Sequence, residues 1–326
     1  MSVPAPQPEV DSATPPAPTP ARPSRRDTLL TLGRRLYAVA MVGLLIFVLV
    51  DKRDDLVRVA SGARPWVLVA VCVTTFGQLA ISSAFWSSAL RGWGSPVGWP
   101  ACFDATLASA PTRYLPGGIW YAVGRVAILR RRGARTSTLS AVAALEMVLV
   151  PVVGFALGGL MVAAAAGDAP LTAPGLIAAV VVLAAVSSPP AVNLALRLLA
   201  RWRGTTHEPL TWALHLRLVG WTVAVWIFQA FNFALYLIAF PNVHVGGPVE
   251  VAGAYMIAWG VGWLAIFAPQ GLGVFEATLT TILVGHTAAG LALVVGGYRA
   301  VIAVRDAIGY AGALLARRVH PLPEPS

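Results

Sequence analysis

The chain has 326 residues, of which 57% are hydrophobic and only 12% are charged. Soluble domains average about 45–50% apolar and about 25% charged residues, so this composition excludes an ordinary soluble enzyme and predicts an all-α polytopic membrane protein. The formal net charge of +10 does not predict a nucleic-acid partner, because the basic residues flank apolar runs as topology signals do and no zinc-finger spacing or base-stacking motif accompanies them.

The N-terminal segment, residues 1–35, is rich in proline, alanine and arginine and poor in large apolar side chains. We therefore expect a disordered cytoplasmic tail there. The apolar run at 36–50 is short, but the charged stretch DKRDD follows it without a small-residue cleavage site. This pattern predicts an uncleaved first membrane span, and residues 317–326 are expected to form a second cytoplasmic tail.

Further apolar segments follow, and a single crossing takes about 20 residues. They lie at about residues 66–90, 100–129, 136–166, 171–199, 211–240, 249–286 and 288–316. Two of them are interrupted near the centre, at Leu115-Pro116-Gly117-Gly118 and at Pro269-Gln270-Gly271-Leu272-Gly273. Proline ends the preceding helix and glycine tolerates the irregular backbone that follows.

The first interrupted segment is too short for two crossings. Its arms, 100–113 and 117–129, reach roughly 20 Å each at 1.5 Å per residue, whereas the hydrocarbon core is about 30 Å thick. We therefore expect a re-entrant hairpin whose second half-helix starts at Gly118. The first arm of the hairpin at 249–286 is longer, so full crossings stay open there.

Basic residues predict the orientation. With both termini inside, most arginines, including the cluster at 130–132, lie on the cytoplasmic side, and those left outside are only Lys52, Arg53, Arg58 and Arg64. The positive-inside rule favours this arrangement, which has about six transmembrane helices besides the two hairpins.

An internal repeat is visible at the two breaks. YLPGGIW at 114–120 aligns with FAPQGLG at 267–273, with an aromatic residue, a proline, a glycine and a large aliphatic residue in register. We expect one transmembrane domain at 36–316 with halves at about 36–166 and 171–316. Each half contains two spans, a broken hairpin and a third span, so the halves are inverted, as in transporters whose broken helices meet near the midplane.

Charged residues at membrane depth mark a candidate site, because such residues usually face a cavity or a partner. The set is Asp104, Arg113, Arg125, Glu146, Glu276, Arg299, Arg305 and Asp306. Arg113 is expected to face an anionic group together with the N–H groups of the following half-helix. The alternative is a structural pair with Glu146 or Glu276. For Arg125 three roles stay open: contact with an anionic group, a structural ion pair, or extension of its side chain to the cytoplasmic interface.

The remaining charges leave several roles open. Glu276 lies in the first turn of its half-helix. Three roles stay open for it: an N-terminal cap, a counter-charge to Arg113 or a proton-coupling group. Glu146 and Arg299 occupy equivalent positions in the repeat, which predicts a charge pair or a shared cavity lining. Arg305 and Asp306 are adjacent on one span, so we expect each to need its own partner.

The candidate substrate-binding residues are therefore Arg113, Pro116, Gly117, Gly118, Arg125, Glu146, Pro269, Gly271, Gly273, Glu276 and Arg299. We expect no catalytic residue, metal or cofactor, because there is no GxSxG, HExxH, phosphate-binding loop or CxxC motif. Small-residue runs at 154–159 and 163–167 predict close helix packing. Trp66, Trp86, Trp93 and Trp99 near span ends are predicted to be interfacial anchors.

The chain resembles the lysylphosphatidylglycerol synthase transmembrane-region family of flippase-like membrane proteins. The residues that carry the resemblance are YLPGGIWYAVGR (114–125) with the basic turn ILRRRGAR after it, the span with Glu146, PQGLGVFEA (269–277) and a last span with an arginine. The resemblance covers about residues 36–316. It implies movement of lipids with charged headgroups, such as aminoacylated phosphatidylglycerol or polyprenyl-phosphate glycolipids, between leaflets. The full-length synthases add a cytosolic aminoacyltransferase domain that this chain lacks, so synthase activity is not expected. Gln270 also stands where a glycine is more usual.

We therefore expect a multi-pass protein of a bacterial-type inner (cytoplasmic) membrane that moves a lipid with a phosphate headgroup between leaflets, passively or coupled to an ion gradient. Arg113 and the half-helix N-termini would hold the headgroup, while Glu146 and Glu276 balance charge or handle protons. Two alternatives stay open. One is a non-catalytic membrane subunit that partners a cell-envelope enzyme, which deep charges paired only with each other would favour. The other is a small-solute or ion secondary transporter, which a closed cavity would favour.

Overall fold

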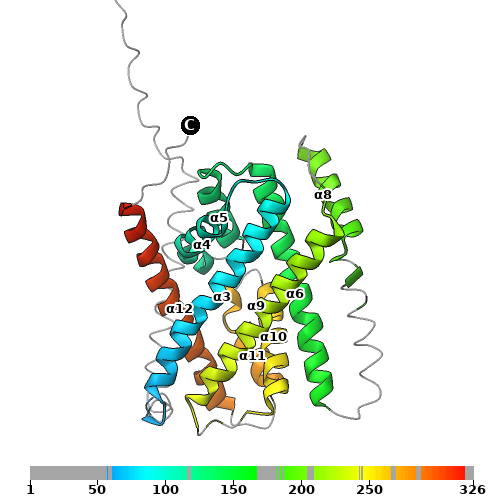
Figure 1. Ribbon diagram of the computed structural model, residues 1–326. Helices are drawn as coiled ribbons and strands as arrows, with labels where there is room; N and C mark the ends of the chain where they lie inside the picture. The colour runs from blue at the N-terminus through cyan, green and yellow to red at the C-terminus, as the bar shows by residue number, and fades with distance from the viewer. Residues whose placement is uncertain are drawn as a thin grey trace, which may run out of the picture. The chain divides into compact units, whose positions relative to one another are not determined.

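A computed structural model describes residues 61–115, 119–166, 187–203, 209–241, 245–265, 269–283 and 288–319, together with a few isolated positions beside these ranges. Within these ranges the secondary structure is entirely helical, and no strand occurs (Figure 1). The first span expected at 36–50, the first ten residues and three more (182, 183 and 186) of the span expected at 171–199, and the tails at 1–35 and 320–326 lie outside the described residues.

The helices follow the apolar segments of the sequence. In chain order they are α3 (Pro65–Gly92), α4 (Trp99–Ala108), the 3-10 helix η1 (Ala110–Tyr114), α5 (Trp120–Arg130), α6 (Thr136–Ala165), α8 (Pro189–Arg203), α9 (Trp212–Ile238), α10 (Pro248–Leu264), the 3-10 helix η2 (Pro269–Gly271), α11 (Val274–Ile282) and α12 (Ala288–Val319). Proline stands in the first turn of α3, α4 and α10, where the missing N–H costs nothing.

Three of the described helices, α3, α6 and α9, are long and apolar enough to cross a membrane. They coincide with the spans expected at 66–90, 136–166 and 211–240. Large apolar side chains on α3 and α9 are more than half exposed, among them Val69, Val73, Ile227 and Phe231. Such surfaces are rare on soluble monomers and are what a helix presents to lipid.

The first hairpin breaks earlier than predicted. Its first arm stops being α-helical at Ala108, η1 follows, and α5 begins at Trp120 rather than at Gly118. Residues 116–118 lie outside the described ranges. Pro111 explains the early end, because proline cannot donate the helical hydrogen bond and disfavours helical backbone at the residue before it. The α-helical arms are therefore shorter than the roughly 20 Å expected.

The second hairpin breaks where the sequence predicts, at 269–273. Three residues there have left-handed backbone, Gln270 with φ of 50°, Gly271 with 66° and Gly273 with 83°. Glycine adopts this conformation readily, and other residues rarely do so. The tip therefore keeps the conformation that suits glycine, although glutamine occupies one of its positions.

The long helices pack in pairs around the hairpins. α3 lies along α9 in the opposite direction, since the Arg64 N–H donates to the Ala239 carbonyl at 2.9 Å at one end, and Gly92 meets Leu214 at the other. α6 packs along α10, and α12 along α4. In the view of Figure 1, α4 and α5 lie in the upper part and α10 and α11 in the lower part.

Two glycines allow the contact between α6 and α10. A Cβ atom added to Gly158 would lie 2.9 Å from the carbonyl oxygen of Gly253, and one added to Gly253 would lie 2.8 Å from that of Gly158. The close packing predicted for 154–159 is thus confirmed. The prediction for 163–167 is wrong where the run is described, because Ala164 and Ala165 are exposed.

Candidate functional site

A cavity of about 240 Å³ is lined by residues of both hairpins and of the long helices α3, α6, α9 and α12. The two hairpin tips, η1 and η2, pack against each other. Charged side chains converge on this cavity, and its lining includes Arg113, Arg125, Glu146, Arg299 and Arg305. Of the predicted site residues, Gly271 lines it as well.

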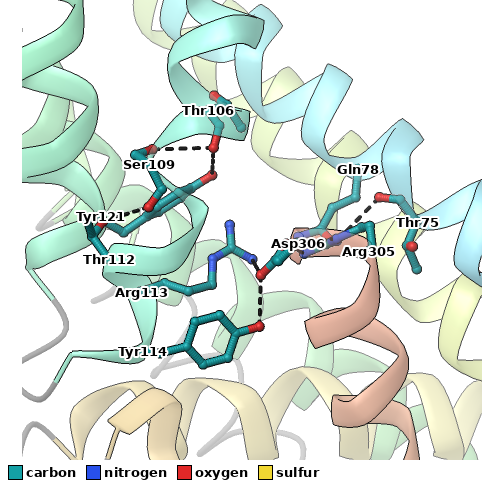
Figure 2. A network of polar contacts seen from close by, with 10 residues as sticks. All are labelled: Thr75, Gln78, Thr106, Ser109, Thr112, Arg113, Tyr114, Tyr121, Arg305 and Asp306. Atoms are coloured by element: carbon teal, nitrogen blue, oxygen red, sulfur yellow. Dashed lines mark hydrogen bonds and ion pairs between the residues drawn. The ribbon is translucent and has the colours of Figure 1, made fainter. Parts of the chain in front are cut away.

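Asp306 on α12 is the meeting point of the first tip and α12 (Figure 2). Arg113 Nη1 lies 3.2 Å from Asp306 Oδ2, and the Tyr114 hydroxyl donates to the same oxygen at 3.0 Å. Arg305 Nε and Nη2 donate to the other oxygen, Oδ1, at 3.0 and 2.7 Å. The partner of Arg113 is therefore neither of the two glutamates considered.

The pairing within α12 contradicts the expectation of separate partners for Arg305 and Asp306. The arginine side chain is long enough to turn back to the carboxylate of the next residue. Its Nη1 also donates to Gln78 Oε1 at 2.8 Å and to the Thr75 carbonyl at 3.3 Å, both on α3. Arg305 has no exposed surface, and these hydrogen bonds make it a link between α12 and α3.

Arg125 on α5 forms a bidentate pair with Glu146 on α6. Nη1 donates to Oε1 at 3.0 Å, and Nη2 pairs with Oε2. The guanidinium lies 4.4 Å from the ring centre of Trp86 and 4.2 Å from that of Tyr121. Arg125 is only 2% exposed, so the predicted reach to the interface is wrong. Trp86 is fully buried and is not an interfacial anchor.

Glu276 serves two partners on the second hairpin. Its Oε2 accepts the Gly273 N–H at 2.7 Å, which satisfies the backbone donor of the N-cap residue of α11. Its Oε1 pairs with Arg299 Nε on α12. The cap prediction is therefore confirmed, while the counter-charge is Arg299 and not Arg113.

Arg299 also holds the second tip directly. Its Nη1 donates to the Gln270 carbonyl at 2.9 Å, and its guanidinium lies 4.7 Å from the ring centre of Phe275. Glu146 and Arg299 do not pair with each other. Both line the shared cavity, and each pairs with the half-helix of its own hairpin.

The first half-helix begins at Trp120, and Ile119 precedes it without a side-chain cap. Pro116, Gly117 and Gly118 lie outside the described residues, so the anion site expected at this helix start stays a prediction. In the second break, Pro269 begins η2 and Gly273 is the N-cap of α11.

Two features of the site were missed in the sequence. Asp306 was recognised as a deep charge, but its role as the partner of two arginines was not. Its spacing from Arg299, two helical turns along α12, was the available signal, because such residues share one helix face. The aromatic rings on which the guanidinium groups stack were also not predicted. Arg113 lies 4.2 Å from the ring centre of Tyr121, at the distance of Arg125 from the same ring, which is cation–π geometry.

The charges around the cavity do not balance. In the part of the chain that the structure describes, the arginines are Arg113, Arg125, Arg299 and Arg305, and the carboxylates paired with them are Glu146, Glu276 and Asp306. One positive charge remains in excess. Asp104 does not supply the missing carboxylate, because it pairs with Arg132 and Arg317 and does not line the cavity.

Comparison with known proteins agrees with the motif resemblance. A search of curated proteins found no match to the chain. The model of the family described as the lysylphosphatidylglycerol synthase TM region matches residues 35–306, a stretch that contains both hairpins and every charged residue around the cavity. The chain therefore belongs to the lysylphosphatidylglycerol synthase TM-region family.

Proposed function

We propose that the protein moves lipids with an anionic, phosphate-bearing headgroup between the leaflets of the cell membrane. The cavity between the hairpin tips holds the headgroup, and the protein acts as a carrier rather than an enzyme. Phospholipids, aminoacyl-phospholipids and polyprenyl-phosphate glycolipids share the phosphate that this chemistry recognises. Movement is passive or coupled to an ion gradient.

The observation that carries this proposal is the sharing of Asp306 by two arginines. If a phosphate draws Arg113 away, Asp306 keeps both hydrogen bonds from Arg305 and the one from Tyr114. Arg125 and Arg299 are each the only described ion-pair partner of a glutamate. Releasing either would leave a carboxylate unpaired at depth, which is costly. Arg113 is thus the guanidinium that an anion can engage at least cost.

The size and position of the cavity support a headgroup site. Pockets for drug-sized ligands have volumes of about 300–1,000 Å³, and this one is about 240 Å³. It is large enough for a headgroup and too small for acyl chains, which must lie along the apolar outer surfaces of the helices.

The packing of the helices supports an inverted repeat. α3 and α9 correspond and lie antiparallel, and the contacts of α4 with α12 match those of α10 with α6. The charges follow the same rule with the signs exchanged. In the first half an arginine on the half-helix, Arg125, pairs with a glutamate on the next long helix, Glu146. In the second half Glu276 on the half-helix pairs with Arg299 on the next long helix. Re-entrant hairpins from opposite sides and cytoplasmic termini belong to this proposal.

One observation favours a second candidate function. Each deep charge around the cavity has an ion-pair partner, as expected of a membrane subunit that holds a cell-envelope enzyme in place. The two candidates differ in what Arg113 does, since only a carrier needs its guanidinium to contact lipid.

Leaflet exchange in liposomes tests the proposal. Purified protein is reconstituted with fluorescent phosphatidylglycerol, and exchange is followed by chemical quenching of the outer leaflet. We expect exchange by the wild type and at least a roughly tenfold loss in Arg113→Gln, because a hydrogen bond to a charged group contributes about 1.5–3 kcal/mol.

Arg317→Gln is the matched control. Like Asp306, Asp104 is held by two arginines, and removal of Arg317 leaves it paired with Arg132 at 2.7 Å, away from the cavity. Normal exchange is expected in this variant. If folded wild-type protein exchanges no anionic lipid, the carrier is refuted and the membrane-subunit function takes its place.

A further inference from the structure

We infer that Tyr121 on α5 is a positioning residue for the headgroup phosphate. Its ring holds the Arg113 guanidinium in a place where Asp306 does not engage it fully, so that an anion can take it at lower cost. This inference rests on the proposed function and deepens it, because it names the group that keeps Arg113 available to the lipid.

The ring of Tyr121 contacts two guanidinium groups. The Cζ atoms of Arg113 and Arg125 each lie over it, 4.2 Å from its centre, and all three residues line the cavity. A cation over a ring is attracted by the negative charge of the ring face and needs no hydrogen-bond acceptor there. An arginine held in this way can therefore still direct N–H donors at the oxygens of a phosphate.

The ring is itself held in place by its neighbours. Arg125 is buried and bound to Glu146 through two nitrogens, so it is a fixed contact of the ring. The Tyr121 hydroxyl donates to the Thr106 carbonyl on α4, at a long distance of 3.5 Å (Figure 2). The ring thus spans from α4 to the buried ion pair, and its position does not depend on Arg113.

Close packing within the first hairpin brings this ring to Arg113. Gly124 lies three residues after Tyr121 and so on the same face of α5. A Cβ atom added to Gly124 would lie 2.9 Å from Ser109 Cβ and 3.0 Å from Thr112 Oγ1. The absence of a side chain lets α5 approach η1, the element that carries Arg113.

The ion pair between Arg113 and Asp306 is long. Its closest approach, 3.2 Å between Nη1 and Oδ2, exceeds that of every other ion pair between described residues. Arg305 binds the same carboxylate through two nitrogens at 3.0 and 2.7 Å. Asp306 is 3% exposed and Arg113 is 15% exposed, so the arginine is the member of the pair that a ligand reaches.

The ring explains why this pair stays long. Without it, the Arg113 guanidinium would be free to approach Asp306 with two nitrogens, as Arg125 approaches Glu146. Bidentate pairs of this kind are the strong ones, and an anion would have to break such a pair in order to bind. A guanidinium already held on a ring has also lost rotamer freedom before the phosphate arrives, which lowers the entropic cost of binding.

Leaflet exchange of tail-labelled phosphatidylglycerol by the reconstituted full chain tests this role. At a low mole fraction of labelled lipid, Tyr121→Leu should slow exchange by at least about threefold, within the range of a cation–π contact. The difference should shrink as the mole fraction rises, because the ring acts on binding. Tyr121→Phe keeps the ring and should restore most of the rate that the leucine variant loses.

The Arg113→Gln background shows whether the ring acts through Arg113. Adding Tyr121→Leu to this variant should slow its residual exchange no further, since the positioned group is already absent. A ring that only supports the fold or Arg125 would slow exchange in both backgrounds. Equal slowing in both would therefore overturn the inference.

A second measurement keeps the shape of the ring and decides the case in which the leucine variant does not fold. Phenylalanine analogues with increasing numbers of fluorine atoms at position 121 withdraw negative charge from the ring face, so exchange should fall stepwise along the series. Equal exchange across the series would refute the positioning role and leave lipid transport standing. If the folded wild type exchanges no phosphatidylglycerol, the proposed function fails, and this inference fails with it.

Discussion

The pair between Arg125 and Glu146 gives the sharpest stability prediction, and the change that tests it is Glu146→Gln. The substitution keeps the shape of the side chain and removes its charge. Arg125 is 2% exposed and Glu146 15%, and Arg125 has no other carboxylate partner within the described ranges. The guanidinium would therefore remain buried without a counter-charge.

The structure sets the size of the effect by comparison with Arg113→Gln. Removing one partner of a buried pair costs about 3–5 kcal/mol. Removing Arg113 leaves Asp306 bonded to Arg305 and Tyr114, so no buried charge loses its last partner. The loss is one charged contact, about 1.5–3 kcal/mol, with the weaker cation–π contact to Tyr121. At about 2 °C per kcal/mol for a large domain, Glu146→Gln should lower Tm by at least about 6 °C and Arg113→Gln by less.

The measurement is thermal unfolding in detergent, followed by tryptophan fluorescence. Glu250→Gln is the matched control, because Glu250 lies in the first turn of α10 and forms no ion pair with a described residue. A carboxylate in the first turn of a helix contributes about 0.3–1 kcal/mol through the helix dipole. Replacing Arg125 and Glu146 together by leucine should recover most of the loss, since apolar substitutes for buried pairs are often neutral or stabilising.

The reasoning fails if Glu146→Gln has the same Tm as the control Glu250→Gln. It also fails if Arg113→Gln is the more destabilising of the two, because Asp306 would then depend on Arg113 and the excess charge would not reside there. The stability order and the exchange order are expected to be opposite, with Glu146→Gln the worse for folding and Arg113→Gln the worse for transport among proteins that fold.

Three further predictions concern the fold. Gly158→Leu should lower the unfolding free energy by about 1–3 kcal/mol through overpacking, whereas Gly220→Leu, at a site with nothing within 4 Å, should not; equal melting of the two would contradict the packing of α6 on α10. Gln270→Gly should melt at the same temperature as the wild type or higher, because it relieves a left-handed backbone that costs other residues about 1–2 kcal/mol, and a lower Tm would count against that conformation. In a background without native cysteines, Arg131→Cys and Gly247→Cys should react with an impermeant maleimide from opposite sides of the membrane, and labelling from one side would refute the inverted topology.

Much of the helix arrangement was predictable because membrane spans are coded by long apolar runs. The bounds of α3, α6 and α9 differ from the expected spans by only a few residues. The first break starts earlier than predicted, because Pro111 already ends helical hydrogen bonding, whereas the prediction was based on Pro116 and the two glycines after it. Both signals are local, and choosing between them needs the contacts of η1 with its neighbours.

The membership of the site was more predictable than its pairing. Deep charges are few, and the cost of burying them predicts that they meet at a cavity or in pairs. Which arginine pairs with which carboxylate depends on helix rotation and side-chain reach, and a local sequence pattern predicts neither. Arg305 shows this best, because its reach to the adjacent Asp306 defeats the rule that neighbouring residues on a helix point apart.

The position of Arg299 and Asp306 on α12 links the two tips to one helix. Arg299 binds the Gln270 carbonyl at the second tip, and Asp306 holds Arg113 and Tyr114 at the first. In the proposed function, an anion that takes Arg113 weakens the hold of α12 on the first tip, while the second tip keeps both contacts to Arg299. Headgroup binding would then act unequally on two hairpins that are otherwise related by the repeat. Such an asymmetry is what a carrier with a single site needs in order to open toward one leaflet at a time.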